Sequence, residues 1–233
     1  MPPYVLAWRK RRLSLGKAAF FFVYTCMNLR QHSKEGQDIV LYHWIRTVGE
    51  TNRVAVEFGA RDGFEGSNVR MFARLGWRLV QWDTDQSQHV SREFVTRENV
   101  NDTFARHGVP PEPDILSIDV DGNDYWIWEA LTYLPRIVVI EYNPNFGIGE
   151  SAVVRYDPNR KWTGDAAFSA SFTAMNDLAR RKGYVCVDEV GHDLVFVRES
   201  LLLPKSVNPT LPRHIHRQTG YDQFTAPTRQ IKL

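Results

Sequence analysis

A short apolar segment that ends in a glycine turn constrains the fold of this chain more than any other feature. Val54–Phe58 is apolar except for Glu57, which is the pattern of a short, buried parallel strand. Gly59 and Gly63 follow, and glycine allows a sharp turn and a close approach of a ligand to the main chain. A helix is predicted next from apolar side chains at helical spacing behind a polar cap, namely Val69, Phe72 and Ala73 behind Ser67 or Asn68. Strand, glycine turn and helix in this order are typical of α/β folds that bind nucleotides.

The spacing within the glycine turn argues against a dinucleotide dehydrogenase. It reads Glu57-x-Gly59-x-x-x-Gly63, whereas the dinucleotide fingerprint is G-x-G-x-x-G. We expect Glu57 to accept a hydrogen bond or to pair with a cation beside the turn. The pattern is similar to the first motif of class I S-adenosylmethionine-dependent methyltransferases. A glycine turn that merely joins a strand to a helix is the structural alternative.

A second strand, Arg78–Asp83, is predicted to end in a carboxylate. It lies roughly twenty residues past the glycines, as expected for a strand–turn–helix–strand unit. An acidic side chain there can accept hydrogen bonds from both ribose hydroxyls of a nucleotide, and Asp83 is favoured over Asp85. Glu93–Thr96 is predicted to be a short edge strand. In the polar turn that follows, we expect Asn101 either to meet an adenine edge or to cap a helix.

Three aspartates crowd the end of the next predicted strand. Ile115–Ile118 is apolar, and Asp119, Asp121 and Asp124 follow it closely. Carboxylates at this spacing raise one another's pKa, which is one way to tune a general base. The three side chains are also hard oxygen ligands that suit Mg²⁺ or Ca²⁺, although the loop lacks the length and the closing Glu of an EF-hand. A polar residue of the same segment is expected to cap the helix that follows, either Asn123 or Asp124.

A third buried strand begins near Arg136 and ends in Glu141, Tyr142 and Asn143. In a parallel sheet these three side chains lie at the same edge as Asp83 and Asp119. Polar strand ends gathered in this way are typical of a ligand site at a topological switch point. Each of them alone is more often structural.

The rest of the chain is predicted to add two helices, a long loop and a β-hairpin. The loop over residues 147–165 is long enough to cover a substrate. The other elements are a helix over Ile39–Ile45 with Asp38 as its N-cap, a helix opened by Ser169 or Ser171 and ended by Gly183, and a terminal hairpin of Tyr184–Val190 and Asp193–Val197.

Composition and charge exclude several classes of protein. The 233 residues are 43% hydrophobic and 24% charged, as expected for one soluble α/β domain with extensions. The two cysteines imply no disulfide framework, so a reducing, cytoplasmic location is expected. A net charge of +2 hides an acidic body between two basic ends, which argues against an enzyme that acts on nucleic acid.

Residues 1–30 and 201–233 are expected to extend a domain over residues 31–200. Near the N-terminus a basic cluster, Arg9–Arg12, precedes an apolar run that is too short for a membrane span and has no signal-cleavage site. A helix packed on the domain is favoured there, with peripheral contact to anionic lipid as the alternative. The basic, proline-punctuated tail is expected to pack on the body or on a second subunit, as in a homodimer.

Several segments together resemble the FkbM-type methyltransferases, in particular uncharacterised relatives found beside polysaccharide genes. The resemblance spans residues 31–200, and the chain departs from the family pattern at Arg61 and at residues 81–84. The matching segments are Ser33–Asp38, Val56–Gly63, Ser117–Trp126, Val139–Pro144, Tyr156–Pro158, Ala170–Ser171 and Lys182–Tyr184.

The resemblance implies a class I methyltransferase fold, which is a Rossmann-like α/β sheet of seven strands with helices on both faces and an antiparallel strand supplied by the terminal hairpin. It implies an S-adenosylmethionine-dependent O-methyltransferase that acts on a sugar or glycan hydroxyl. Asp121 is the candidate base, with Asp119 beside it. The cofactor would contact Glu57, Gly59, Ala60, Asp62, Gly63, Asp83, Asn101 and Asp119, and the acceptor would contact Trp126, Glu141, Tyr142 and Asn143. The alternatives are a divalent-metal-dependent O-methyltransferase and an inactive methyltransferase-like protein that binds a partner.

Overall fold

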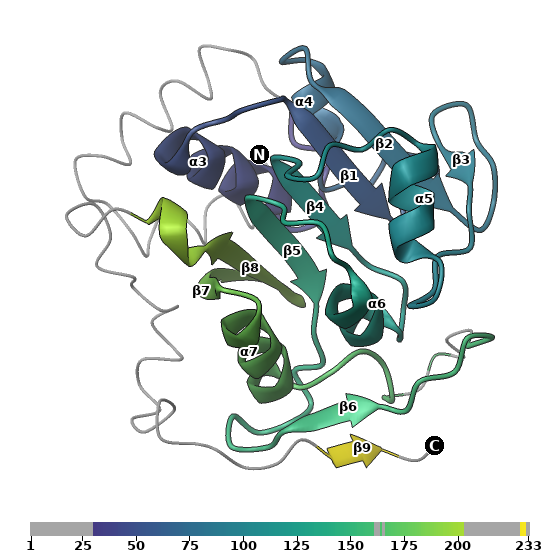
Figure 1. Cartoon of the computed structure of the whole chain (residues 1–233), viewed down its shortest axis with the longest axis vertical. Coiled ribbons are helices and arrows are strands. Elements are labelled where there is room, and N and C mark those ends of the chain that lie inside the picture. The colour runs from purple at the N-terminus through teal and green to yellow at the C-terminus, as the bar shows by residue number, and fades with distance from the viewer. Residues whose placement is uncertain (1–29, 161–163, 165, 203–228, 232–233) are drawn as a thin grey trace.

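Seven strands form one mixed sheet in the order β3-β2-β1-β4-β5-β8-β7 (Figure 1). The structure is a computed structural model, and it describes residues 30–160, 164, 166–202 and 229–231. The strands of the sheet are β1 (Val54–Phe58), β2 (Arg78–Asp83), β3 (Ser91–Arg92), β4 (Ile115–Ile118), β5 (Ile137–Glu141), β7 (Tyr184–Val190) and β8 (Asp193–Arg198). Pairs from β3 to β5 are parallel, whereas β8 runs antiparallel to both β5 and β7. The prediction of an α/β fold with a terminal hairpin is therefore confirmed, and the sheet is consistent with a Rossmann-like fold.

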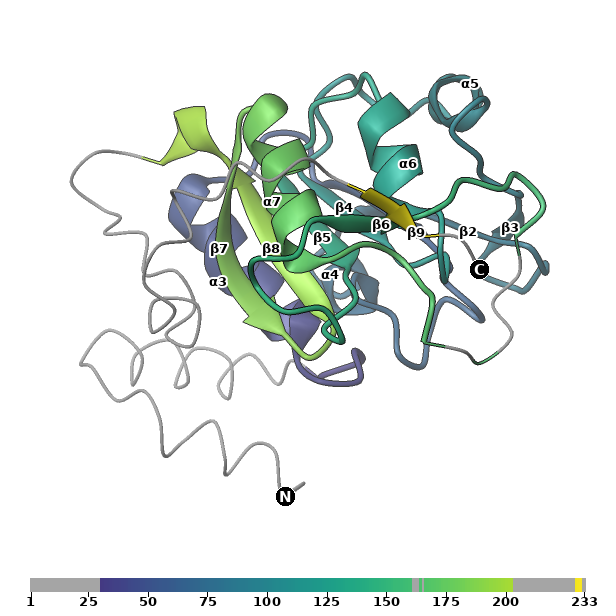
Figure 2. The ribbon, with the colours of Figure 1, turned by 90° about the horizontal axis from the view of Figure 1, so that it is seen from below.

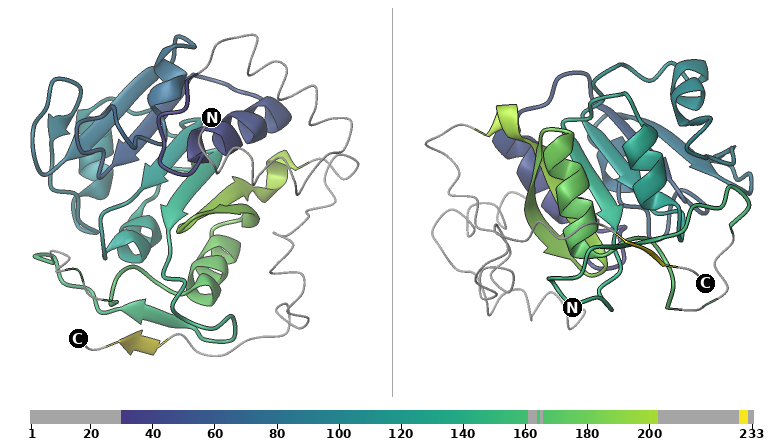
Figure 3. Two further views of the ribbon diagram at one scale, coloured as in Figure 1. Left: turned by 180° about the vertical axis from the view of Figure 1, so that it is seen from behind. Right: turned by 60° about the horizontal axis from the view of Figure 1, so that its bottom comes forward.

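Helices cover both faces of this sheet (Figure 2). They are α3 (Gln37–Val48), α4 (Arg70–Ala73), α5 (Val100–Arg106), α6 (Asp124–Ala130), α7 (Phe172–Arg181) and the short 3₁₀ helix η1 (Glu199–Leu201). Val56 and Phe58 of β1 belong to the core that α5, α6 and α7 cover. Ala55 of the same strand belongs to the opposite core, beneath α3 and α4. Figure 3 shows α3 lying across the back of the sheet. Since both faces are buried, the strand ends are the part of the sheet open to a ligand.

A second, two-stranded sheet lies beyond the carboxyl ends of β4 and β5 (Figure 1). In it β6 (Ala152–Val154) pairs in parallel with β9 (Arg229–Ile231). The segment that we predicted as one loop, residues 147–165, thus contains a short buried strand. A segment near the C-terminus therefore returns to the body of the same chain, as expected for the tail.

Three local predictions need correction. The helix α3 begins at Gln37 behind Gly36, and Asp38 lies inside its first turn, where its carboxylate accepts hydrogen bonds from the backbone and hydroxyl of Ser33. The edge strand is Ser91–Arg92 and not Glu93–Thr96, because the pairing with β2 begins at Trp82. The helix after the glycine turn is the single turn α4, which starts later than its Ser67 cap suggested.

The other end of the domain agrees with the sequence. Ser171 is the N-cap of α7 and accepts a hydrogen bond from the backbone N–H of Ala174. Gly183 follows that helix with a φ of +80°, the left-handed conformation that favours glycine. The predicted N-terminal helix and most of the tail lie outside the described residues. Within the described part of the chain, no helix is long and apolar enough to cross a membrane.

Candidate functional site

Four strands of the sheet place acidic side chains along one edge. β2 ends at Asp83 and β5 at Glu141, and Asp119 follows β4 directly. The antiparallel strand β8 begins at Asp193, which lies opposite Glu141 in the pairing register. Asp193 accepts a 2.7 Å hydrogen bond from the side chain of Gln37, so α3 holds it in place. We refer to this edge, with Asp121 from the loop after β4, as the acidic rim.

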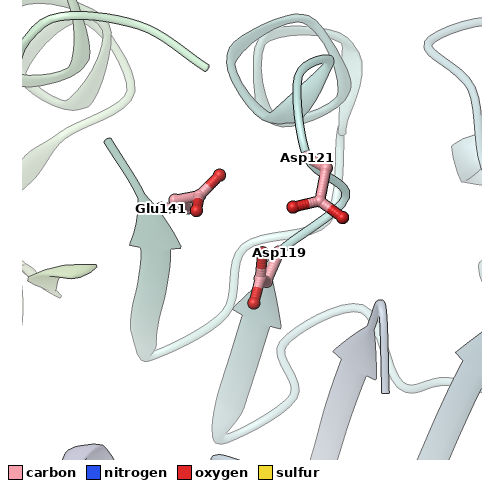
Figure 4. Close-up of side chains that lie close together, drawn as sticks. All are labelled: Asp119, Asp121 and Glu141. Atoms are coloured by element: carbon pink, nitrogen blue, oxygen red, sulfur yellow. The ribbon is translucent and has the colours of Figure 1, made fainter. Parts of the chain in front are cut away.

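Three carboxylates of the acidic rim converge between the ends of β4 and β5 (Figure 4). Oxygen atoms of Asp119, Asp121 and Glu141 lie within 4.8 Å of one another. The side chains of Glu141 and Asp121 extend toward one another, with Asp119 at the tip of β4. One carboxylate oxygen of Glu141, Oε2, is buried and has no hydrogen-bond partner among the described residues. The arrangement brings three carboxyl groups together and leaves one oxygen without a partner among the described residues.

The environment of this trio shifts the pKa of each carboxyl upward. Burial raises the pKa of Asp119 to about 6, and the charge of Asp121 adds to the effect. Burial also raises the pKa of Asp121 and, more strongly, that of Glu141, to which the neighbouring aspartates contribute. Lys34 and Arg61 act in the opposite direction on both aspartates. The positive charges of these two residues therefore favour the ionised forms of Asp119 and Asp121, against the larger effect of burial.

The loop that carries Asp121 is built by Asp124. The carboxylate of Asp124 accepts hydrogen bonds from the backbone N–H groups of Val120 (2.8 Å) and Gly122 (2.9 Å) and is fully buried. Asp121 itself has a φ of +55°, which is uncommon for a residue other than glycine and is frequent at functional sites. In the alternative of a metal site, Asp124 was expected beside Asp119 and Asp121, but its oxygens are used by the loop. Among the described residues, Glu141 and not Asp124 lies with these two aspartates.

At the two glycines of the first motif, neighbouring protein atoms fill the space that a side chain would need. A Cβ on Gly59 would lie 1.6 Å from the carbonyl oxygen of Asp119, and one on Gly63 would lie 2.7 Å from Val90. Both have positive φ. Ala60 is buried, and its N–H donates to the carbonyl of Trp82. The glycine turn is therefore packed against the ends of β2 and β4.

Glu57 does not reach the rim surface. It is 3% exposed and accepts hydrogen bonds from the hydroxyl of Ser67 (2.6 Å), the N–H of Asn68 (2.6 Å) and the amide of Gln81 (2.8 Å). Burial raises the pKa of Glu57 to about 7 against these bonds. We correct its assignment as a cofactor ligand. Glu57 joins β1, β2 and the start of α4 beneath the glycine turn.

The carboxylates of Asp83 and Asp62 both accept hydrogen bonds from the loops around them. Oδ2 of Asp83 accepts a 2.7 Å hydrogen bond from the backbone N–H of Arg61, while Oδ1 accepts from Thr84 and Asp85. Asp62 is exposed, and its Oδ1 accepts from the N–H groups of Phe64 and Glu65, which lowers the pKa of Asp62. Asp83 thus ties the glycine turn to β2, and its contact with ribose hydroxyls stays a prediction.

Three of the remaining predicted site residues have roles in the fold. The side chain of Asn101 bonds the backbone of Ala130, the last residue of α6, and of Thr132 just after it, so the adenine role is not supported. The amide of the fully buried Asn143 donates to the carbonyls of Ala166 and Phe168. The hydroxyl of Tyr142 donates to Glu189 at 2.5 Å. Their polar groups are occupied, which leaves Glu141 as the acidic member of that strand end.

The sequence analysis did not place two residues at the site, namely Asp193 of the acidic rim and the cation Lys34. Asp193 opens the second strand of the hairpin, and the antiparallel pairing places that residue at the rim. The hairpin pattern predicts the strand, so the placement of Asp193 could have been found from it. The spacing of residues in the sequence predicts no role for Lys34. Its stem lies along Gly66, where the segment before α3 forms a bridge with the loop after β1 through Ser33.

No protein-family model matches the chain, and no curated protein matches it in sequence. The geometry of the rim is therefore what bears on function.

Proposed function

We propose that the protein is an S-adenosylmethionine-dependent O-methyltransferase of the FkbM type that acts on a sugar or glycan hydroxyl. The observation that carries the proposal is the sheet. Beyond β5 its parallel strands are followed by the antiparallel strand β8, and acids stand at the carboxyl ends of β2 and β4. In open α/β sheets, ligands bind beyond the carboxyl ends of the parallel strands, near the point where the order of the strands along the sheet changes direction. The resemblance of Ser117–Trp126 and Val139–Pro144 to that family agrees with this proposal.

The acidic rim fits the charge of this cofactor. The methionine end of S-adenosylmethionine carries a sulfonium and an ammonium against one carboxylate, and Asp119 offers the opposite charge. Oδ2 of Asp83 accepts one bond within the protein, and a carboxylate oxygen can accept two, so it can also take a ribose hydroxyl. Bound at the rim, the cofactor supplies a methyl group on a positively charged sulfur.

Asp121 is the residue we assign to the acceptor. It is exposed, stands beside Asp119 and Glu141, and is held by a strained turn. Its carboxylate would orient the acceptor hydroxyl by accepting its hydrogen bond, and it would take the proton when the oxygen becomes methylated. Burial raises the pKa of Asp121, which makes its carboxylate a stronger proton acceptor, and the charges of Lys34 and Arg61 limit this rise. Holding donor and acceptor in line supplies much of the rate enhancement in such a reaction.

Calorimetric titration with S-adenosylmethionine and S-adenosylhomocysteine tests the proposal. We expect micromolar binding to the wild-type protein and at least about tenfold weaker binding to Asp83→Ala, because a charged hydrogen bond is lost. Asp85→Ala is the matched control, since Asp85 is an exposed neighbour whose carboxylate is not part of the rim. A wild-type protein that binds neither compound would reject the proposal and favour the alternative of an inactive, partner-binding protein.

A divalent cation is the second candidate, and the trio of Asp119, Asp121 and Glu141 is the observation that favours it. Carboxylate oxygens suit Mg²⁺, and the unpartnered oxygen of Glu141 could serve as one of its ligands. The metal would then orient a diol acceptor. Two measurements test the metal site. In calorimetric titration with Mg²⁺, binding heat that disappears in Glu141→Gln supports the site, whereas full methyl transfer in excess EDTA excludes a role for a metal in the reaction.

A further inference from the structure

Two aromatic rings and one guanidinium group meet beside the acidic rim. The rings of Trp126 on α6 and Tyr156 after β6 have centroids 6.2 Å apart and an angle of 63° between their planes. The guanidinium carbon of Arg97, from the segment between β3 and α5, lies 5.8 Å from the first ring centroid and 5.0 Å from the second. We call Trp126 and Tyr156 the ring corner, and Arg97 fills it.

Both rings of the corner are anchored by hydrogen bonds at their edges. Nε1 of Trp126 donates to the carbonyl of Val154 at 2.8 Å. The hydroxyl of Tyr156 donates to the carboxylate of Glu98, the residue next to Arg97. Each ring therefore has a fixed orientation while one of its faces meets the guanidinium. Because the ring planes are inclined at 63°, a flat ligand that replaces the guanidinium can stack on one ring and contact the other at an angle.

The ring corner is fastened to the loops of the acidic rim. The amide of Asn123, beside the turn that holds Asp121, donates to the carbonyl of Asp157 next to Tyr156 at 2.8 Å. The side chain of Arg160 packs on Gly122, where an added Cβ would meet it at 2.5 Å. On the other side, β3 pairs with the end of β2 at Asp83, and Arg97 follows β3 by a few residues. The corner is thus tied to the loop of Asp121, and Arg97 comes from the segment that follows the strand paired with Asp83.

Arg97 is held weakly enough to be displaced. Its side chain is 43% exposed, and its ion pair with Glu98 is 3.6 Å long and also exposed. Exposed ion pairs and exposed cation–π contacts contribute little to stability, whereas stacking of a base on an aromatic ring is stronger. A planar guanidinium and a purine base also present similar flat faces to a ring.

We propose that the ring corner stacks the adenine base of the methyl donor, and that Arg97 occupies the place of the base until the donor binds. This inference rests on the proposed function and deepens it. It moves Trp126 from the acceptor, where the resemblance had put it, to the cofactor. It also names Tyr156 as a binding residue, although that residue lies beyond β6 and far in sequence from the glycine turn.

Removal of the rings and removal of Arg97 are expected to have opposite effects. Dissociation constants for S-adenosylhomocysteine and for adenosine are measured by calorimetry. Trp126→Leu and Tyr156→Ala should each weaken the binding of both compounds about tenfold, the scale of one lost stacking contact. Arg97→Ala should raise the affinity severalfold, because the competing guanidinium is gone. Tyr156→Phe keeps the ring and should stay within about twofold of wild type.

Phe94→Ala is the matched control, because Phe94 is an aromatic residue of the same β3–α5 segment and is 43% exposed outside the corner. Wild-type binding of S-adenosylhomocysteine with unchanged affinity in the two ring variants would overturn the inference and leave the proposed function intact. Weakened binding of S-adenosylhomocysteine but not of adenosine would also overturn it, since the base would not be the group recognised. No binding to the wild-type protein would overturn both. Circular dichroism of each variant checks that it has folded.

Discussion

Two carboxylates, one fully buried and one half-buried, stand at opposite ends of the same pair of strands, and their surroundings differ. Asp114 precedes β4, is fully buried, and accepts hydrogen bonds from the backbone N–H groups of Thr51, Asn52 and Arg53. Arg136 lies 3.5 Å from it. Glu141 ends β5, has a buried oxygen without a partner among the described residues, and faces other carboxylates.

The difference separates the stability of the fold from its function. At the amino edge, every lone pair of a buried acid is directed at a donor, which is what stability requires. At the carboxyl edge, like charges are gathered and one acceptor is left open, which lowers stability and suits the binding of a positively charged ligand. Substitutions and pH changes at the two edges should therefore have different consequences.

The largest effect is expected at the amino edge. Asp114→Ala removes the acceptor of three backbone donors and the carboxylate that pairs with the charge of Arg136. The free energy of unfolding should therefore fall by about 3–5 kcal/mol. Urea denaturation measures it. Glu141→Gln is the matched change at the other edge and should keep or increase the stability. Equal losses in the two variants would contradict the contrast.

Asp121→Asn is expected to lower turnover by at least about 100-fold, the usual contribution of a general base. The affinity for S-adenosylhomocysteine should stay within a few fold of wild type, since Asp121 faces the acceptor. Steady-state kinetics and calorimetry on the same preparation separate the two effects. Wild-type turnover in this variant would remove Asp121 from the mechanism.

The pH dependence of stability should report the rim. Burial raises the pKa of Asp119 from 3.8 to about 6 and that of Asp193 from 3.8 to about 7. The unfolded chain therefore loses these protons first as the pH rises, and the free energy of unfolding should fall by a few kcal/mol between about pH 4 and pH 7. Urea denaturation across this range measures the slope, which Asp193→Asn should flatten. A slope that is the same in Asp193→Asn would contradict the assignment.

The smallest effect is expected from Asn101→Ala. Its side chain bonds the backbone of Ala130 and Thr132 at the end of α6, so the variant should lose about 1 kcal/mol of stability. The affinity for S-adenosylhomocysteine should not change. A tenfold loss of affinity at full stability would restore the adenine role that the sequence suggested.

Much of the fold could be predicted because its signals are local. The apolar runs Val54–Phe58, Ile115–Ile118 and Ile137–Glu141 contain the strands as observed, and a cap and a glycine bound α7. The misplaced edge strand shows the limit. A strand of two residues has no periodicity of its own, and its position depends on its partner β2.

The candidate site could be predicted in position but only partly in membership. Strand ends place Asp83, Asp119 and Glu141 at one edge because parallel strands end together. What each side chain bonds could not be read from spacing. Asp124 and Glu57 look like ligands in the sequence, yet backbone N–H groups and neighbouring side chains occupy their oxygens.

The crowding at Gly59 has a consequence for how such motifs are used. The absence of a side chain there allows two neighbouring loops to cross main chain against main chain, with the carbonyl of Asp119 in the space a Cβ would take. A glycine signature of this kind therefore indicates that two neighbouring loops pack closely through their main chains. It does not indicate which molecule binds above them. Proteins retrieved by that signature will share a chain crossing, and their chemistry has to be read from the acids at the neighbouring strand ends.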